Sequence, residues 1–184
     1  MDFSVRQLAQ SRVDKLDLLR LLYGSVVVPP AVRDELGIES GYPGANVLSA
    51  ALTDRWITVH SSQGLVIATE LADSLDPGEA EAIALAEERA ARFLLIDDAK
   101  GRRFARQRGL PVVGVAGVLL AAKSAGILAA VAPVLRNLSS AGYRLSPELM
   151  SGVLQSSRRV TAIGADRSAS ADPADPFAAH IAVP

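Results

Sequence analysis

The stretch that most constrains the fold runs over residues 76–108 and reads DPGEAEAIALAEERAARFLLIDDAKGRRFARQR. Asp76 can cap a helix, Pro77 suits the first helical position, and Glu79 stands where a capping box places its acid. Apolar residues then recur at helical spacing as far as Ala90. The sequence therefore predicts a helix with a well-defined start just after Asp76.

A short apolar run at residues 93–96 follows this helix. Four residues are too few for a further helix, and the run fits a buried strand of a parallel sheet. The strand ends on Asp97 and Asp98. Because open α/β sheets bind their ligands beyond the carboxyl ends of the strands, we expect a functional site at these two acids.

Strands and helices alternate along most of the chain, which predicts an α/β fold with helices on both faces of a central parallel sheet. We expect residues 1–155 to form this domain. Residues 156–184 are dominated by Ser, Ala, Asp and Pro without periodicity, and we expect them to form a disordered tail. The expected strands cover residues 25–28, 56–60, 93–96 and 110–113. One expected helix ends at Tyr23, and the others cover residues 31–36, 45–53, 76–90, 99–108, 146–154 and two segments within 114–138.

The charged residues are divided unevenly along the chain. Residues 1–98 carry 16 acids and 8 bases, whereas residues 99–147 carry 8 bases and no acid. An acid cluster beside a basic flank suits a metal-dependent enzyme that acts on a polyanion, since the acids hold the cation and the bases contact the phosphates. The alternative interpretation is that helix surfaces are often charged unevenly.

Cysteine is absent, which excludes a disulfide scaffold and thiolate-bound zinc. The N-terminus also lacks a signal-peptide pattern, so we expect a cytoplasmic protein. Residues 114–138 are apolar enough to raise the question of a membrane span. Lys123 interrupts that run, Gly126 suits a helix end and Pro133 a helix start, so we expect two buried helices and no membrane segment.

Glu35, Glu79, Asp97 and Asp98 fall where strand ends and facing helices can bring carboxylates together. A hard cation such as Mg2+ or Mn2+ prefers oxygen ligands and keeps several waters, so a few converging carboxylates suffice. Each acid also has a purely structural interpretation. Glu35 can be a solvated helix residue, Glu79 can close a capping box, and either aspartate can cap the next helix.

Four blocks of this sequence resemble the PIN-domain nucleases, in particular the small prokaryotic branch related to VapC-type toxins: VVVPPAVRDEL, LDPGEAEAIALA, LLIDDAKGRRFA and GLPVVGVAGVLLAAKSAG. The similarity covers about residues 2–154. It implies a Mg2+- or Mn2+-dependent endoribonuclease with an acidic site, often a toxin that a cognate antitoxin neutralises. The family's acids correspond here to Glu35, to Glu79 (Glu81 fits less well), and to Asp98 with Asp97 beside it.

The remaining family acid ends the first strand of the sheet, and the resemblance assigns it to Asp2. Asp2, Phe3 and Ser4 match the end of that block, but only Met1 precedes them. We therefore expect the first, central strand to be truncated in one of two ways: either the true start lies upstream of Met1, or this copy has lost the strand. The second case would weaken the sheet and the site together.

Five cations follow the two aspartates within nine residues, and we expect them to bind the phosphates of RNA: Lys100, Arg102, Arg103, Arg106 and Arg108. Lys100, Arg103 and Arg106 share one helix face, whereas Arg102 points elsewhere. The expected reaction is metal-assisted hydrolysis of an RNA phosphodiester. Two alternatives stay open: a catalytically inactive PIN-like module that binds RNA or a protein, and a structure-specific DNA nuclease. The apolar C-terminal helices could bind an antitoxin or form a homodimer.

Overall fold

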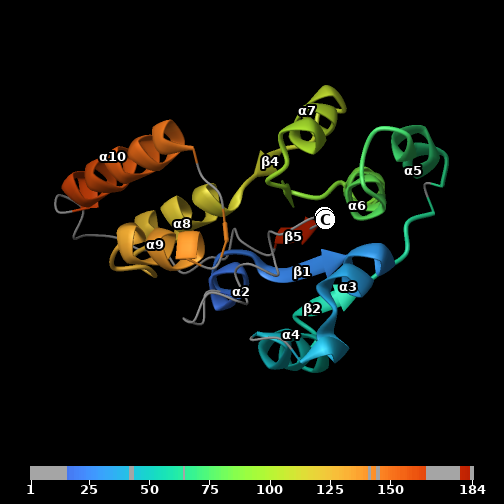
Figure 1. The fold of residues 1–184 in the computed structure, drawn as a ribbon, viewed down its shortest axis with the longest axis horizontal. Coiled ribbons are helices and arrows are strands. Elements are labelled where there is room, and N and C mark those ends of the chain that lie inside the picture. The colour runs from blue at the N-terminus through green and yellow to red at the C-terminus, as the bar shows by residue number, and fades with distance from the viewer. Residues whose placement is uncertain are drawn as a thin grey trace.

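A parallel β-sheet lies at the centre of the molecule, with helices around it (Figure 1). The structure, a computed structural model, describes residues 16–41, 44–63, 65–140, 142–143, 146–164 and 179–182. The strands are β1 (Gly24–Val28), β2 (Ile57–Val59), β3 (Phe93–Leu95), β4 (Val112–Val113) and β5 (Ala179–Ala182), and their order in the sheet is β2-β1-β5-β3-β4. Every neighbouring pair is parallel, which confirms the predicted α/β class.

Helices connect the strands and cover the sheet. They are α2 (Asp17–Tyr23), α3 (Pro30–Leu36), α4 (Ala45–Thr53), α5 (Leu65–Ala72), α6 (Pro77–Glu88), α7 (Ala99–Gln107), α8 (Val115–Ser124), α9 (Val131–Ser140) and α10 (Pro147–Gly164), with a short 3-10 turn at Ile38–Ser40. The bounds of α3, α4, α6 and α7 lie within two residues of those that the sequence predicts. Helix signals in this chain are strong because proline, glycine and aspartate mark most ends.

Alternate residues of β3 belong to different parts of the core. Leu95 packs in a large cluster with residues of α2, α8 and α9, whereas Leu94 and Ile96 pack with residues of α5, α6 and α7. Successive side chains of a strand point to opposite faces of the sheet. Helices therefore cover both faces, as predicted.

The apolar segment 114–138 forms the two helices α8 and α9. Gly126 has a φ of 72°, a left-handed conformation that closes α8 at low cost for a glycine. Lys123 donates a hydrogen bond from Nζ to the carbonyl oxygen of Ala129 at 2.6 Å. Among the described residues, no helix is both long enough and apolar enough to cross a bilayer.

The C-terminal part of the chain differs from our expectation. Helix α10 continues to Gly164, well past the predicted end near Leu154, and residues 179–182 form β5 in the middle of the sheet. The prediction of a disordered tail from residue 156 was therefore wrong for both segments, and residues 165–178 and 183–184 lie outside the described part. β5 pairs with β1 on one side and with β3 on the other. The backbone hydrogen bonds of these two pairings stabilise the strand, although the sequence around it is of low complexity.

The expectation of a truncated first strand concerns residues that the structure does not describe, and so does the placement of Asp2. The central position between β1 and β3 is held by β5. The carboxyl ends of β1 and β3 consequently stay within one continuous sheet, and the segments that follow them carry Glu35 and Asp98.

Candidate active site

Glu79 is the buried acid of the described core, with 5% of its surface exposed. It stands in the first turn of α6, where the predicted N-cap, Asp76, occupies the N-cap position without forming a side-chain capping hydrogen bond. Burial raises the pKa of Glu79 above its ordinary value of 4.5, and the nearby carboxylates of Asp98 and Glu35 raise it further, while Lys100 opposes them. These effects place Glu79 close to both of the other predicted acids.

A pocket of about 400 Å³ opens beside Glu79. Its walls come from the α5–α6 connection, the start of α6 and the junction of β3 with α7, and are formed by Asp73, Ser74, Leu75, Asp76, Glu79, Asp98 and Lys100. Asp73 was not predicted as a site residue, and Asp76 was predicted only as a helix cap. Their spacing around the α6 start was the available signal, but a turn before a helix gives the same pattern.

Asp98 combines two roles. Its Oδ1 accepts hydrogen bonds from the backbone N–H groups of Lys100 at 2.7 Å and Gly101 at 2.9 Å, so it caps α7. The side chain also lines the pocket and is exposed. The predicted capping interpretation is correct, and it does not exclude the functional one, since both capping bonds use the same oxygen.

Asp97 lies on a different side of the backbone. Its Oδ1 accepts a hydrogen bond from the N–H of Val115 at 3.1 Å and another from the hydroxyl of Tyr143 at 3.1 Å. Val115 is the first residue of α8. Asp97 is absent from the pocket walls, so the structure brings Asp98, and not Asp97, to Glu79.

Glu35 lies on α3, the helix that follows β1. A Cβ atom placed on Gly78 would be 3.0 Å from Glu35 Oε1, so the Glu35 side chain packs against the first turn of α6. Gly78 directly precedes Glu79. The structure thus brings Glu35 to the edge of the acid pocket from the other half of the sheet.

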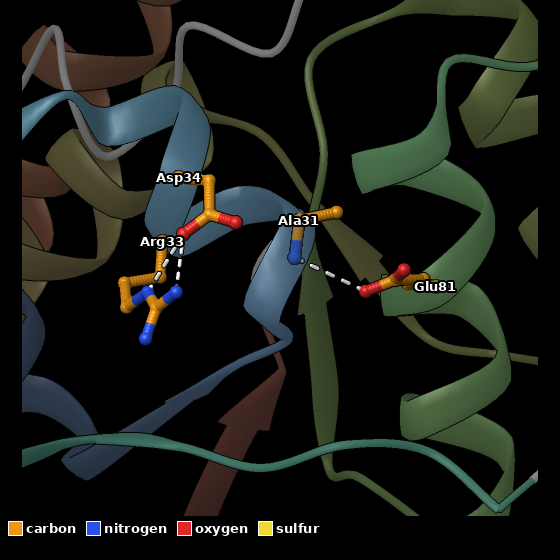
Figure 2. A network of polar contacts seen from close by, with 4 residues as sticks. All are labelled: Ala31, Arg33, Asp34 and Glu81. Carbon is orange, nitrogen blue, oxygen red and sulfur yellow. Dashed lines mark hydrogen bonds and ion pairs between the residues drawn. The ribbon is translucent and has the colours of Figure 1, made fainter.

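Glu81 has a structural partner. Its Oε2 accepts a hydrogen bond from the backbone N–H of Ala31 at 3.2 Å, which joins α6 to the start of α3 (Figure 2). The same view shows the adjacent pair of Arg33 and Asp34 on the surface of α3. Glu81 therefore holds in place the helix that carries Glu35, in keeping with its lower rank as a ligand.

The five predicted RNA-binding cations have different surroundings. Lys100 lines the pocket, and Arg103 and Arg106 are exposed on α7. Arg108 forms ion pairs with Glu70 and Glu87, each at 2.9 Å, and only 25% of its side chain is exposed. Arg102 is half-buried, and its Nε is a buried atom that has no hydrogen-bond partner among the residues that the structure describes.

The donor set fits a hydrated hard cation. Within the described ranges, no group of three or more acidic or histidine side chains is arranged to hold a metal ion by itself. Glu79 and Asp98 nevertheless share one pocket, and their repulsion raises the pKa of Glu79. Mg2+ is commonly held by one or two carboxylates and several waters. Two carboxylates with Glu35 nearby therefore match such an ion better than they match zinc.

A parallel α/β sheet with an acid pocket beyond the carboxyl end of the interior strand β3 is consistent with a PIN-like fold. The family model for the PIN domain, DUF3368, matches residues 7–159, and the chain belongs to this family. PIN-domain proteins are generally nucleases and usually bind divalent metals. Searches of curated proteins and of solved structures gave no significant match.

Proposed function

We propose that this chain is a metal-dependent endoribonuclease that hydrolyses RNA phosphodiesters. The observation that carries the proposal is the buried Glu79 carboxyl, which lines the same pocket as Asp98 and Lys100. Two carboxylates that repel each other in one pocket favour a bound cation or a proton there. A divalent cation bound there would relieve this repulsion.

Glu79 and Asp98 would hold the ion, with Glu35 within reach from α3; Asp2 is the fourth proposed ligand and lies outside the described residues. Once bound, such an ion lowers the pKa of a coordinated water and neutralises the charge that develops on the phosphate. The carboxylates supply negative charge for the cation and do not act as nucleophiles.

The side chains on α7 orient the polyanion. Lys100 places a positive charge in the pocket wall next to the acids, where it can contact the phosphate that is cleaved. Arg103 and Arg106 extend this charge along the exposed face of the helix. Phosphate contacts carry no sequence information, so this surface selects a nucleic-acid backbone and not a base sequence.

As the biological role, we propose the toxin of a toxin–antitoxin pair. The support is the resemblance to VapC-type toxins across four sequence blocks, and a cognate antitoxin is the proposed partner. Exposed apolar side chains at Leu21 and Leu149 offer contact area for a partner protein or for a second copy. Growth arrest on expression of the wild-type chain, and its absence with Asp98→Asn, would support this role.

Cleavage of single-stranded RNA by the purified full chain tests the activity. We expect cleavage in Mg2+ or Mn2+, loss of activity in EDTA, and a fall of about 100-fold or more in Asp98→Asn, because charge stabilisation at a reacting phosphate is worth at least that much. Asp34→Asn is the matched control, since Asp34 pairs with Arg33 at the surface of α3 and not in the pocket.

The same assay separates the alternatives. Preferred cleavage of flap DNA would favour a structure-specific DNA nuclease. RNA binding without cleavage in either metal would favour the inactive module, for which the absence of a three-ligand group among the described side chains is the supporting observation.

A further inference from the structure

We propose that Asp97 is a positioning residue, which holds Asp98 in the acid pocket by anchoring the end of β3 to the helices on the opposite face of the sheet. This inference rests on the proposed function, since it assigns Asp97 a role towards the same pocket. It also gives separate roles to the adjacent acids Asp97 and Asp98, which the sequence alone does not distinguish.

The anchor consists of hydrogen bonds to the Asp97 carboxylate, mainly to Oδ1, with the Val115 N–H also 3.4 Å from Oδ2. The N–H of Val115 and the hydroxyl of Tyr143 both donate to Asp97 Oδ1 at 3.1 Å. The first N–H groups of a helix lack partners within the helix, and the helix dipole attracts negative charge to this end. The start of α8 is therefore a favourable position for a carboxylate. Tyr143 follows α9 and is 8% exposed. Asp97 thus ties β3 to two further segments of the chain.

The direction of the backbone explains why the two acids separate. Ile96 N–H donates to the Val113 carbonyl oxygen at 2.9 Å, so the β3–β4 ladder continues one residue beyond Leu95. Side chains of an extended chain alternate between the two faces. Asp97 falls on the face of Leu95 and α8, and Asp98 falls on the face of Ile96, α6 and α7. Because the Asp97 carboxylate is held on one face, the Asp98 side chain lies on the opposite face.

The fit around Asp97 is close. A Cβ atom on Gly114 would lie 2.5 Å from Asp97 Oδ1, nearer than real Cβ atoms come to such an oxygen. An alanine at position 114 would therefore displace the Asp97 carboxylate, because the backbone that leads into α8 passes directly beside it. A half-buried carboxylate held by these hydrogen bonds resembles a supporting contact more than an open ligand.

Asp98 has the complementary character. Its two capping bonds both end on Oδ1, and with the described residues Oδ2 forms no hydrogen bond. The cap holds the side chain at the start of α7, and the anchor at Asp97 holds the peptide that precedes it. Supporting residues of this kind commonly change metal affinity by about 10- to 100-fold when they are removed.

Calorimetric titration of the full chain with Mn2+, followed by RNA cleavage kinetics, tests the inference. We expect Asp97→Ala and Gly114→Ala to bind Mn2+ about tenfold or more weakly and to lower kcat more than they raise the KM for RNA. Tyr143→Phe should shift both quantities in the same direction by less. Asp97→Asn should retain most of the affinity, since a carboxamide oxygen can accept the same two hydrogen bonds.

Gly152→Ala is the matched control for the glycine variant, because a Cβ there meets no atom within 4 Å. Wild-type affinity in both Asp97→Ala and Gly114→Ala would overturn the positioning role and leave the proposed nuclease intact. An affinity in Asp97→Asn as low as that in Asp98→Asn would overturn it too, because Asp97 would then be a direct ligand. Failure of the wild-type chain to bind Mn2+ and to cleave RNA would instead overturn the proposed function, and this inference with it.

Discussion

Glu79 is a carboxyl group in a site that favours its protonated form. Burial raises its pKa first, and the carboxylates of Asp98 and Glu35 add to the shift. A raised pKa in the folded state means that folding is linked to proton uptake. We therefore expect the ionised side chain to lower the stability of the fold at neutral pH, and a bound cation to offset this effect.

This linkage predicts an unusual effect of Glu79→Gln. The contribution of Glu79 to stability is complete below the unfolded-state pKa and is lost as the pH rises through the higher folded-state pKa. In EDTA near neutral pH, we therefore expect Glu79→Gln to have a higher free energy of unfolding than the wild type, with the difference vanishing at about pH 4. Urea unfolding followed by circular dichroism at both pH values measures it.

Added Mg2+ should give the wild type a higher free energy of unfolding than Glu79→Gln, since only the wild type gains binding energy from the ion. A variant that is less stable than the wild type at neutral pH without metal would contradict the electrostatic account of the pocket.

Arg106 and Arg108 lie two residues apart on α7 but should respond differently to mutation. Arg106 is exposed, whereas Arg108 is paired with Glu70 and Glu87. We expect Arg108→Ala to lower the free energy of unfolding by about 1 kcal/mol, a modest value because surface ion pairs are screened by water and salt. Urea unfolding at low and high salt measures this change.

Arg106→Ala should leave stability unchanged and weaken RNA binding. For one lost phosphate contact, the slope of log affinity against log salt should fall by about 1. Titration of fluorescent RNA at several salt concentrations measures the slope. The opposite pattern, with a stability loss in Arg106→Ala and an RNA-binding loss in Arg108→Ala alone, would show that α7 presents a different face to RNA.

Sequence spacing singled out Glu79 and Asp98, two of the four acids that line the pocket, but it could not assign the partners of the predicted site residues. Asp97 and Asp98 are identical by type and adjacent, and only the packing of α8 shows which one turns away. In the same way, Arg108 belonged to the predicted phosphate-binding set because nothing local indicated Glu70, which is distant along the chain. Tertiary partners of long side chains are not encoded by local patterns.

At the scale of whole elements, the described strand with the least local support is the central one. β5 is four residues long, yet it pairs with β1 over residues 24–27 and with β3 at residues 93–94. Strands β1 and β3 lead to the segments that carry Glu35 and Asp98. A disturbance of β5 should therefore affect both stability and the relative position of these two acids.

Ile181→Pro tests the role of β5, since proline at a central strand position removes a backbone donor from the ladder. We expect the free energy of unfolding to fall by about 1–3 kcal/mol for each buried backbone group left without a partner. Thermal and urea unfolding measure the loss, and Ile181→Val, which keeps the backbone donor, is the control. A proline variant as stable as the valine variant would show that β5 contributes little to the sheet.

The other strands and most helices were predictable for a simple reason. β1 is bounded by Gly24 and by prolines, and α6 begins with an aspartate followed by proline, so local chemistry marks their ends. β5 has no such marks, because it follows an Ala- and Asp-rich segment and its partners lie far away in sequence. β5 forms by pairing with strands that are distant in sequence, and no local sequence pattern predicts such pairing.

At the scale of the molecule, the two faces of the sheet meet at the acid pocket. The α5–α6 connection and the first turns of α6 and α7 supply its walls, whereas α8 and Tyr143 beyond α9 hold the end of β3 through Asp97. The change of charge along the sequence follows this division, with acids before residue 99 and bases on α7 just after it. A cation site beside a phosphate-binding helix is the arrangement that the account requires.

Crystals of the full chain grown with Mn2+ test this claim most directly, because the anomalous signal of the ion locates it without assumptions about activity. We predict one strong peak about 2.2 Å from carboxylate oxygens of both Glu79 and Asp98, as hard cations bind such ligands. A peak bound elsewhere, or Glu79 and Asp98 turned apart with no ion between them, would contradict the account.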